Sequence, residues 1–203
     1  MRRIFLLSPA RVDGLRARLL LNRRAPFPLA REFHRTGLPL AEVFTFASGL
    51  YFRGKHAYAL RFARAEDGDV IRVITTNAGL LDPLTPVTPA ALRRFGRVDI
   101  DADNPRYRRP LQRDATRLAR TLARDGRAIL LGSIATAKYR DVLLEAFGDR
   151  LVFPADFVGR GDMSRGALLL RAARHGEELP YLSVRGALLT GRRAPRVRDM
   201  KRT

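Results

Sequence analysis

Small polar residues follow three apolar segments of this sequence, where each segment has the composition of a buried β-strand ending in a turn. Ser8, Asn77 and Ser133 each come at the end of such a segment. If the three strands are neighbours in one parallel sheet, these side chains meet at one edge, where open α/β sheets bind their ligands. The sequence therefore predicts a ligand cleft at the strand ends.

The residues around this cleft favour an anionic ligand. A helix is expected to begin near Ser133 or Thr136, and the free amide groups and the dipole at its start attract a phosphate or a carboxylate. Basic side chains close by would add charge-assisted hydrogen bonds. The residues predicted to form the cleft are Ser8, Asn77, Ser133, Thr136, Lys138, Arg160 and Arg165.

Catalytic candidates are few. Asp156 or Asp162 could position a hydroxyl group or accept a proton, and Ser133 is a third candidate. Asp162 also stands just before Ser164, near the start of the last expected helix, so a structural capping role is the alternative. No phosphate-binding P-loop, metalloprotease helix or serine-hydrolase elbow is present in the sequence. Whether the cleft performs a reaction is left open.

Neither a metal ion nor a cofactor is expected. The histidines His34, His56 and His175 do not stand at metal-ligand spacing. The acidic residues that alternate over 99–103 are similar to a calcium loop, but the glycine and the distal glutamate of an EF-hand are missing. The chain has no cysteine, which excludes thiolate metal sites and disulfide partners.

The charge of the chain is its most unusual property. Basic residues outnumber acidic ones by 39 to 20, the formal net charge is +19, and all but three of the basic residues are arginine. Nucleic acid is the polyanion that such proteins most often meet. A biased genomic composition could explain arginine in place of lysine, but it does not explain the excess of basic over acidic residues.

Residues 107–125 have the pattern of an amphipathic helix. Leucine and alanine recur on one side, and five arginines fall within about 80° of one another on the other side. Like charges at this spacing repel, so an anion lying along the row is the favoured interpretation, and a solvated face is the alternative. The arginines are Arg109, Arg113, Arg117, Arg120 and Arg124.

A second basic segment follows Gly49, where basic residues alternate with tyrosines in an expected helix. This composition suits phosphate contact combined with base stacking, and the residues predicted to make it are Arg53, Lys55 and Tyr58. An ordinary amphipathic helix that buries its aromatic residues is the equal alternative.

The fold class predicted from these segments is α/β, with one domain over residues 1–184. Expected strands lie at 4–8, 70–76, 128–131, 151–153 and 179–184, giving a mixed sheet of about five strands flanked by helices. Residues 25–40, rich in proline and glycine, are expected to form a loop, and 185–203 a poorly ordered basic tail. No segment has the composition of a membrane span or a secretion signal, so a cytoplasmic location without a membrane partner is expected.

Several short blocks of this chain resemble the YaaA peroxide-stress family in order and spacing. The blocks are Leu6–Ala10, Leu50–Gly54, Gly79–Pro83, Ile129–Tyr139 and, just after Ser164 and Arg165, Gly166–Leu170. The resemblance implies an α/β protein that binds DNA and acts in protection against iron-driven oxidative damage.

Charge and resemblance together predict a protein that binds nucleic acid, DNA rather than RNA, through phosphate-directed contacts that depend little on sequence, in stress protection or DNA maintenance. The alternative is an enzyme acting on a nucleotide or a nucleic-acid base in the strand-end cleft. A weaker third hypothesis is a basic protein that docks on an acidic partner or on ribosomal RNA.

Overall fold

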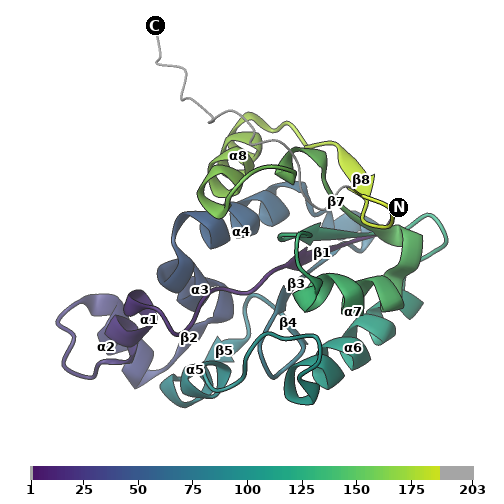
Figure 1. Cartoon of the computed structure of the whole chain (residues 1–203). Coiled ribbons are helices and arrows are strands. Elements are labelled where there is room, and N and C mark those ends of the chain that lie inside the picture. Colours follow the sequence, from purple (N-terminus) through teal and green to yellow (C-terminus); the bar gives the residue numbers. More distant parts are fainter. Residues whose placement is uncertain (1, 188–203) are drawn as a thin grey trace, which may run out of the picture.

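A six-stranded mixed β-sheet forms the centre of the computed structural model, which describes residues 2–187 (Figure 1). The strand order is β4-β3-β1-β6-β7-β8, with the four central strands parallel and the edge strands β4 and β8 antiparallel to their neighbours. This confirms the predicted α/β class, and the short edge strand β4 brings the sheet to six strands rather than about five. The strands are β1 (Arg3–Leu7), β3 (Val70–Ile74), β4 (Leu80–Leu81), β6 (Arg127–Leu131), β7 (Leu151–Pro154) and β8 (Tyr181–Ser183).

The chain changes direction across the sheet at strand β1. It first crosses from β1 to β3 on one side and later returns to place β6 on the other side. Leu7 pairs with Val73 and with Leu131, and the Ser8 amide donates to the Leu131 carbonyl at 3.2 Å, so the strands end together. Ligands of open α/β sheets bind at such a reversal, beyond the carboxyl ends of the strands.

Helices cover both faces of the sheet (Figure 1). Helices α4 (Leu50–Phe62) and α8 (Asp162–His175) pack together on one face, and α6 (Pro105–Arg120) and α7 (Ala137–Phe147) lie on the other. Glycine lets α4 and α8 approach closely, because a Cβ atom at Gly54 would lie 2.6 Å from the Gly166 carbonyl oxygen, and one at Gly166 would lie 2.8 Å from the Tyr51 Cα. The first turns of α4 and α8 are therefore held side by side.

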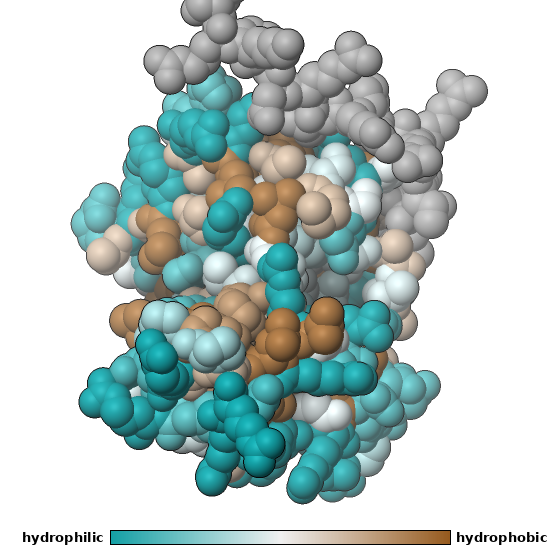
Figure 2. Space-filling model, turned by 90° about the vertical axis from the view of Figure 1, so that its left-hand side faces the viewer, coloured by the Kyte–Doolittle hydropathy of each residue, from teal (hydrophilic) through white to brown (hydrophobic). Residues whose placement is uncertain are grey.

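The remaining elements form a lobe at the carboxyl ends of the parallel strands. Phe44 of α3 joins the lobe to α4 through an edge-on contact with Phe52, at a ring-centroid distance of 5.3 Å. A second edge-on contact, with Phe95 at 6.2 Å, links α3 to α5 within the lobe. Figure 2 shows that the face at left in Figure 1 is not uniformly hydrophilic, because a band of hydrophobic side chains crosses its middle. The elements of this lobe are α1 (Leu15–Leu21), α2 (Pro28–Arg35), β2 (Leu38–Pro39), α3 (Leu40–Ser48), β5 (Pro86–Val87) and α5 (Pro89–Phe95).

Two helices begin at a proline, and there the structure differs from the sequence-based prediction. Residues 25–40 were expected to form a loop, but they contain α2, which starts at Pro28 and buries Phe33. A proline is well tolerated in the first turn of a helix, since the amide it lacks would have no partner there. For the same reason α6 begins at Pro105, and it ends at Arg120, which leaves Arg124 beyond the helix.

The C-terminal tail predicted for 185–203 lies, from residue 188 onward, outside the described residues. Arg185 is described, and its Nε lies 2.8 Å from Asp149 Oδ1. Across residues 2–187, every helix is too short or too polar to cross a membrane.

Candidate functional site

A cleft of about 700 Å³ opens where strands β1 and β6 end, at the point where the chain reverses across the sheet. Its lining includes most of the residues predicted from the sequence, together with two tyrosines and Asp162. The predicted residues that line it are Ser8, Ser133, Thr136, Lys138 and Arg165.

Three helices begin at this cleft. The lining includes residues from the first turn of each helix: Tyr51 from α4, Lys138 from α7 and Arg165 from α8. Ser48, just before α4, also lines the cleft. Among the described residues, no side chain caps the amide groups of these helix starts by a hydrogen bond. Unpaired amides and helix dipoles make the cleft a favourable environment for an anion.

Arg165 is the basic side chain that the fold holds most firmly at the cleft. It is 9% exposed, and its Nε and Nη2 both donate to the Phe157 carbonyl oxygen at 3.2 Å. Its Nη1 lies 3.4 Å from Asp162 Oδ1, a carboxylate that is itself largely exposed. The guanidinium group is therefore positioned before any ligand arrives.

Lys55 lies behind the floor of the cleft, with only 1% of its surface exposed. Its Nζ donates to the Ser8 carbonyl oxygen at 2.6 Å and to Ser8 Oγ at 2.9 Å, and it lies 4.3 Å from the centre of the Tyr51 ring. No ion pair joins it to a carboxylate in the described part of the chain. Burial lowers the pKa of Lys55 to about 7, and the more distant Asp162 opposes that shift.

Two tyrosine hydroxyl groups face the same region. Tyr139 Oη accepts a hydrogen bond from the Ser133 amide at 3.0 Å, whereas Tyr51 Oη is buried and completes no hydrogen bond of normal geometry. Burial raises the pKa of both tyrosines, and Arg165 opposes this effect at each. Both hydroxyls are therefore neutral, and able to donate, at neutral pH.

Apolar side chains, with Asp99 among them, line one wall of the cleft. The apolar residues are Val12, Phe95, Val98 and Ile100, which come from the loops after β1 and around the end of α5. A cleft of this size that combines an anion-favouring end with an apolar wall suits a small ligand carrying both a charged group and a ring.

The other predicted residues of this region lie elsewhere. Asn77 does not line the cleft; its Nδ2 donates to the Arg94 carbonyl at 2.9 Å and so holds the end of α5. Arg160 does not line it either, because its Nε donates to the Asp156 carbonyl at 2.8 Å. Asp156 is exposed and does not line the cleft, whereas the next residue, Phe157, is buried and anchors the loop. Asp162, the alternative acid, does line the cleft, in the first turn of α8.

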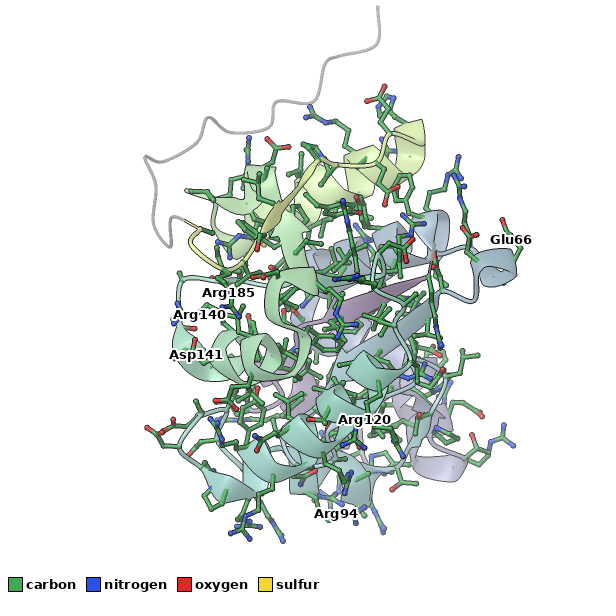
Figure 3. The ribbon with its side chains drawn as sticks, turned by 90° about the vertical axis from the view of Figure 1, so that its right-hand side faces the viewer. Glu66, Arg94, Arg120, Arg140, Asp141 and Arg185 are labelled. Atoms are coloured by element: carbon green, nitrogen blue, oxygen red, sulfur yellow. The ribbon has the colours of Figure 1, made fainter. Side chains whose placement is uncertain are left out.

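A second depression, of about 800 Å³, lies between α5 and α6. Arg94, Arg106 and Arg109 line it together with apolar side chains, and no acidic side chain is among the described residues of its lining. We call it the arginine groove. Arg94, and Arg120 at the end of α6, lie in the lower half of Figure 3. The sequence pattern missed Arg94 and Arg106, because only the packing of α5 beside α6 brings them together.

The arginine row predicted over 107–125 is exposed along its whole length. Two of its members are partly neutralised, since Asp114 Oδ1 lies 3.0 Å from Arg113 Nε and 3.4 Å from Arg117 Nη2. Asp114 is buried and also accepts from the Leu80 amide at 3.0 Å, so it fixes strand β4 to α6. The row continues the arginine groove along the surface with an excess of positive charge.

Two residues predicted to contact nucleic acid are inside the protein, so that prediction was wrong for them. Lys55 is buried behind Ser8, and Tyr58 is fully buried, with its Oη 2.7 Å from Tyr181 Oη and accepting from the Leu179 amide at 2.9 Å. The cause is that α4 lies between the sheet and α8, which leaves only a narrow strip in solvent. Arg53 is exposed on that strip.

No protein-family model matches this chain, and no match is found among the curated proteins or the solved structures.

Proposed function

We propose that this protein binds nucleic acid, and DNA in particular, through the arginine groove and the exposed row on α6. The observation that carries the proposal is the lining of the groove, where Arg94, Arg106 and Arg109 meet and no described residue is acidic. Charge-assisted contacts from arginine to phosphate are directional and independent of base sequence.

The row on α6 extends the same surface. Arg109, Arg113 and Arg117 recur every fourth residue, which spaces them by about 6 Å along the helix axis. A phosphate backbone lying along this helix can meet several guanidinium groups in succession. The arginines of the groove and of α6 account only for phosphate binding. The preference for DNA and a setting in oxidative-stress protection are what the resemblance to the YaaA family implies.

The test is a fluorescence-polarisation titration of labelled duplex DNA, single-stranded DNA and RNA at several salt concentrations. We expect micromolar or tighter binding to duplex DNA at low salt, with log K falling by several units per decade of salt. The double variant Arg109→Gln/Arg120→Gln removes two phosphate contacts, so the slope of log K against log salt concentration should become shallower by about 2.

The matched control is Arg171→Gln/Arg174→Gln, which removes the same charge from exposed positions on α8, across the sheet from α6. It should bind as the wild type does. Equal losses in the two double variants would show that only net charge matters, and absence of binding at low salt would reject the proposal altogether.

A further inference from the structure

The geometry points to a second binding site, in the strand-end cleft, for a nucleoside monophosphate. This cleft and the arginine groove share only Phe95 among their described lining residues, and the inference does not depend on the proposed nucleic-acid binding. Its phosphate would lie against the starts of α4, α7 and α8, and its base against the apolar wall.

The phosphate end is argued from groups that the fold leaves available. Three helices of 13, 11 and 14 residues begin at the cleft without a side-chain cap from residues 2–187, and Arg165 and Lys138 line the same region. Bringing several helix starts together repels their partial positive charges, and an anion relieves that repulsion.

Tyr51 is an independent sign that a ligand belongs here. The residue is 7% exposed and lines the cleft, and its buried hydroxyl completes no regular hydrogen bond with the described residues. The Arg165 guanidinium interacts with this hydroxyl but can only donate, so the hydroxyl proton has no acceptor. A buried hydroxyl group whose proton lacks an acceptor is unfavourable, and native proteins retain few of them. A ligand oxygen in the cleft would give Tyr51 its acceptor.

The volume of the cleft and its apolar side chains favour a ligand that contains a ring over a small inorganic anion. The cleft of about 700 Å³ exceeds what inorganic phosphate needs and suits a mononucleotide. Phe95, Val98 and Ile100 offer apolar contact to a flat base, while the Ser48 hydroxyl offers a partner to a sugar.

The experiment is isothermal titration calorimetry of the full chain with AMP, GMP, CMP and UMP. The matching nucleosides, ribose 5-phosphate and inorganic phosphate serve as comparison ligands. We expect at least one nucleotide to bind with a Kd below about 1 mM, and more tightly than its nucleoside or inorganic phosphate by about tenfold or more.

The decisive variant is Tyr51→Phe, which removes only this hydroxyl. It should leave the thermal unfolding temperature unchanged or raise it, and weaken nucleotide binding about tenfold. The matched control is Tyr107→Phe, because Tyr107 is also fully buried with an unpaired hydroxyl but does not line the cleft. It should keep the wild-type affinity.

The inference would be overturned by no nucleotide binding at millimolar concentration, by equal binding of nucleosides and nucleotides, or by equal weakening in Tyr51→Phe and Tyr107→Phe. Tight binding of inorganic phosphate alone would show an anion site without base recognition, which also rejects it. DNA titrations keep the two proposals distinguishable, because Tyr51→Phe should bind DNA normally and Arg109→Gln/Arg120→Gln should bind the nucleotide normally.

Discussion

Replacing Lys55 by methionine should change how the stability of this protein depends on pH. Methionine has a similar length and fills the same space without a charge. Burial lowers the pKa of Lys55 from 10.5 to about 7 in the folded protein. Between these two values the unfolded chain holds a proton that the folded chain lacks, so the free energy of unfolding rises with pH.

The size of the effect follows from the two pKa values. Between pH 7 and pH 9 the wild type should gain about 2 kcal/mol of stability from this one group, which is about 1 M in the urea midpoint. This window avoids the other shifted groups. Burial lowers the pKa of His56, which therefore acts below pH 6.5, and the raised pKa values of the tyrosines act above pH 10.

The assay is urea unfolding of the wild type and Lys55→Met at pH 6, 7, 8 and 9. The difference in unfolding free energy between Lys55→Met and the wild type should favour the variant most at pH 6, where the wild type buries a charged amine. This difference should shrink as the pH rises. Lys138→Met is the control, because Lys138 is exposed, and its curve should run parallel to the wild type.

The same reasoning can be checked on the amine itself. The chain has only three lysines, so carbon-13 labelling of lysine gives few NMR signals, and Lys55→Met identifies one of them by its loss. That signal should titrate near pH 7. Parallel stability curves for the wild type and Lys55→Met, or a signal that titrates near 10, would refute the argument that burial without a paired carboxylate controls this lysine.

Two further substitutions test packing and surface charge. Gly54→Ala should destabilise the fold by about 1–3 kcal/mol in urea unfolding, because the new methyl group meets the backbone of Gly166, whereas Gly161→Ala enters open space and should change little. Asp114→Asn should lower stability by about 1 kcal/mol, since Asp114 pairs with neighbouring arginines and accepts from the Leu80 amide, yet it should tighten DNA binding in polarisation titrations. Tighter binding without loss of stability would mean that Asp114 is not structural, and unchanged binding would place the nucleic acid elsewhere.

The strand ends were predictable because strand signals are local. Apolar runs that stop at Ser8 and at Ser133 identify β1 and β6, and the rule for open α/β sheets then places a cleft where they end. Of the two capping candidates, Ser133 and Thr136, the second stands directly before α7, but its side chain makes no capping hydrogen bond. What the sequence could not give was the crossing of α4 and α8, since that contact joins Gly54 to Gly166 across more than a hundred residues.

That missing contact explains the main error about α4. Its alternation of basic and aromatic residues fits a nucleic-acid surface and a buried helix equally well, and only the packing partner decides between them. Once α8 covers this helix, Lys55 and Tyr58 are inside the protein, and Tyr51 and Arg165 become neighbours at the cleft. The sequence pattern placed Lys55 and Tyr58 on the surface, whereas both are buried.

The short helix α5 connects the two proposed sites. Phe95 lines both the strand-end cleft and the arginine groove, so one side chain belongs to the walls of both. The end of this helix is tied to the residues after β3, because Thr76 Oγ1 donates to the Phe95 carbonyl at 2.7 Å and Asn77 donates to that of Arg94. Any ligand that moves Phe95 must therefore act on both sites, and such an effect is reciprocal: a nucleotide would change DNA affinity by the same factor as DNA changes nucleotide affinity. The polar residues after β3 thus serve to fix the wall between the sites rather than to bind a ligand themselves.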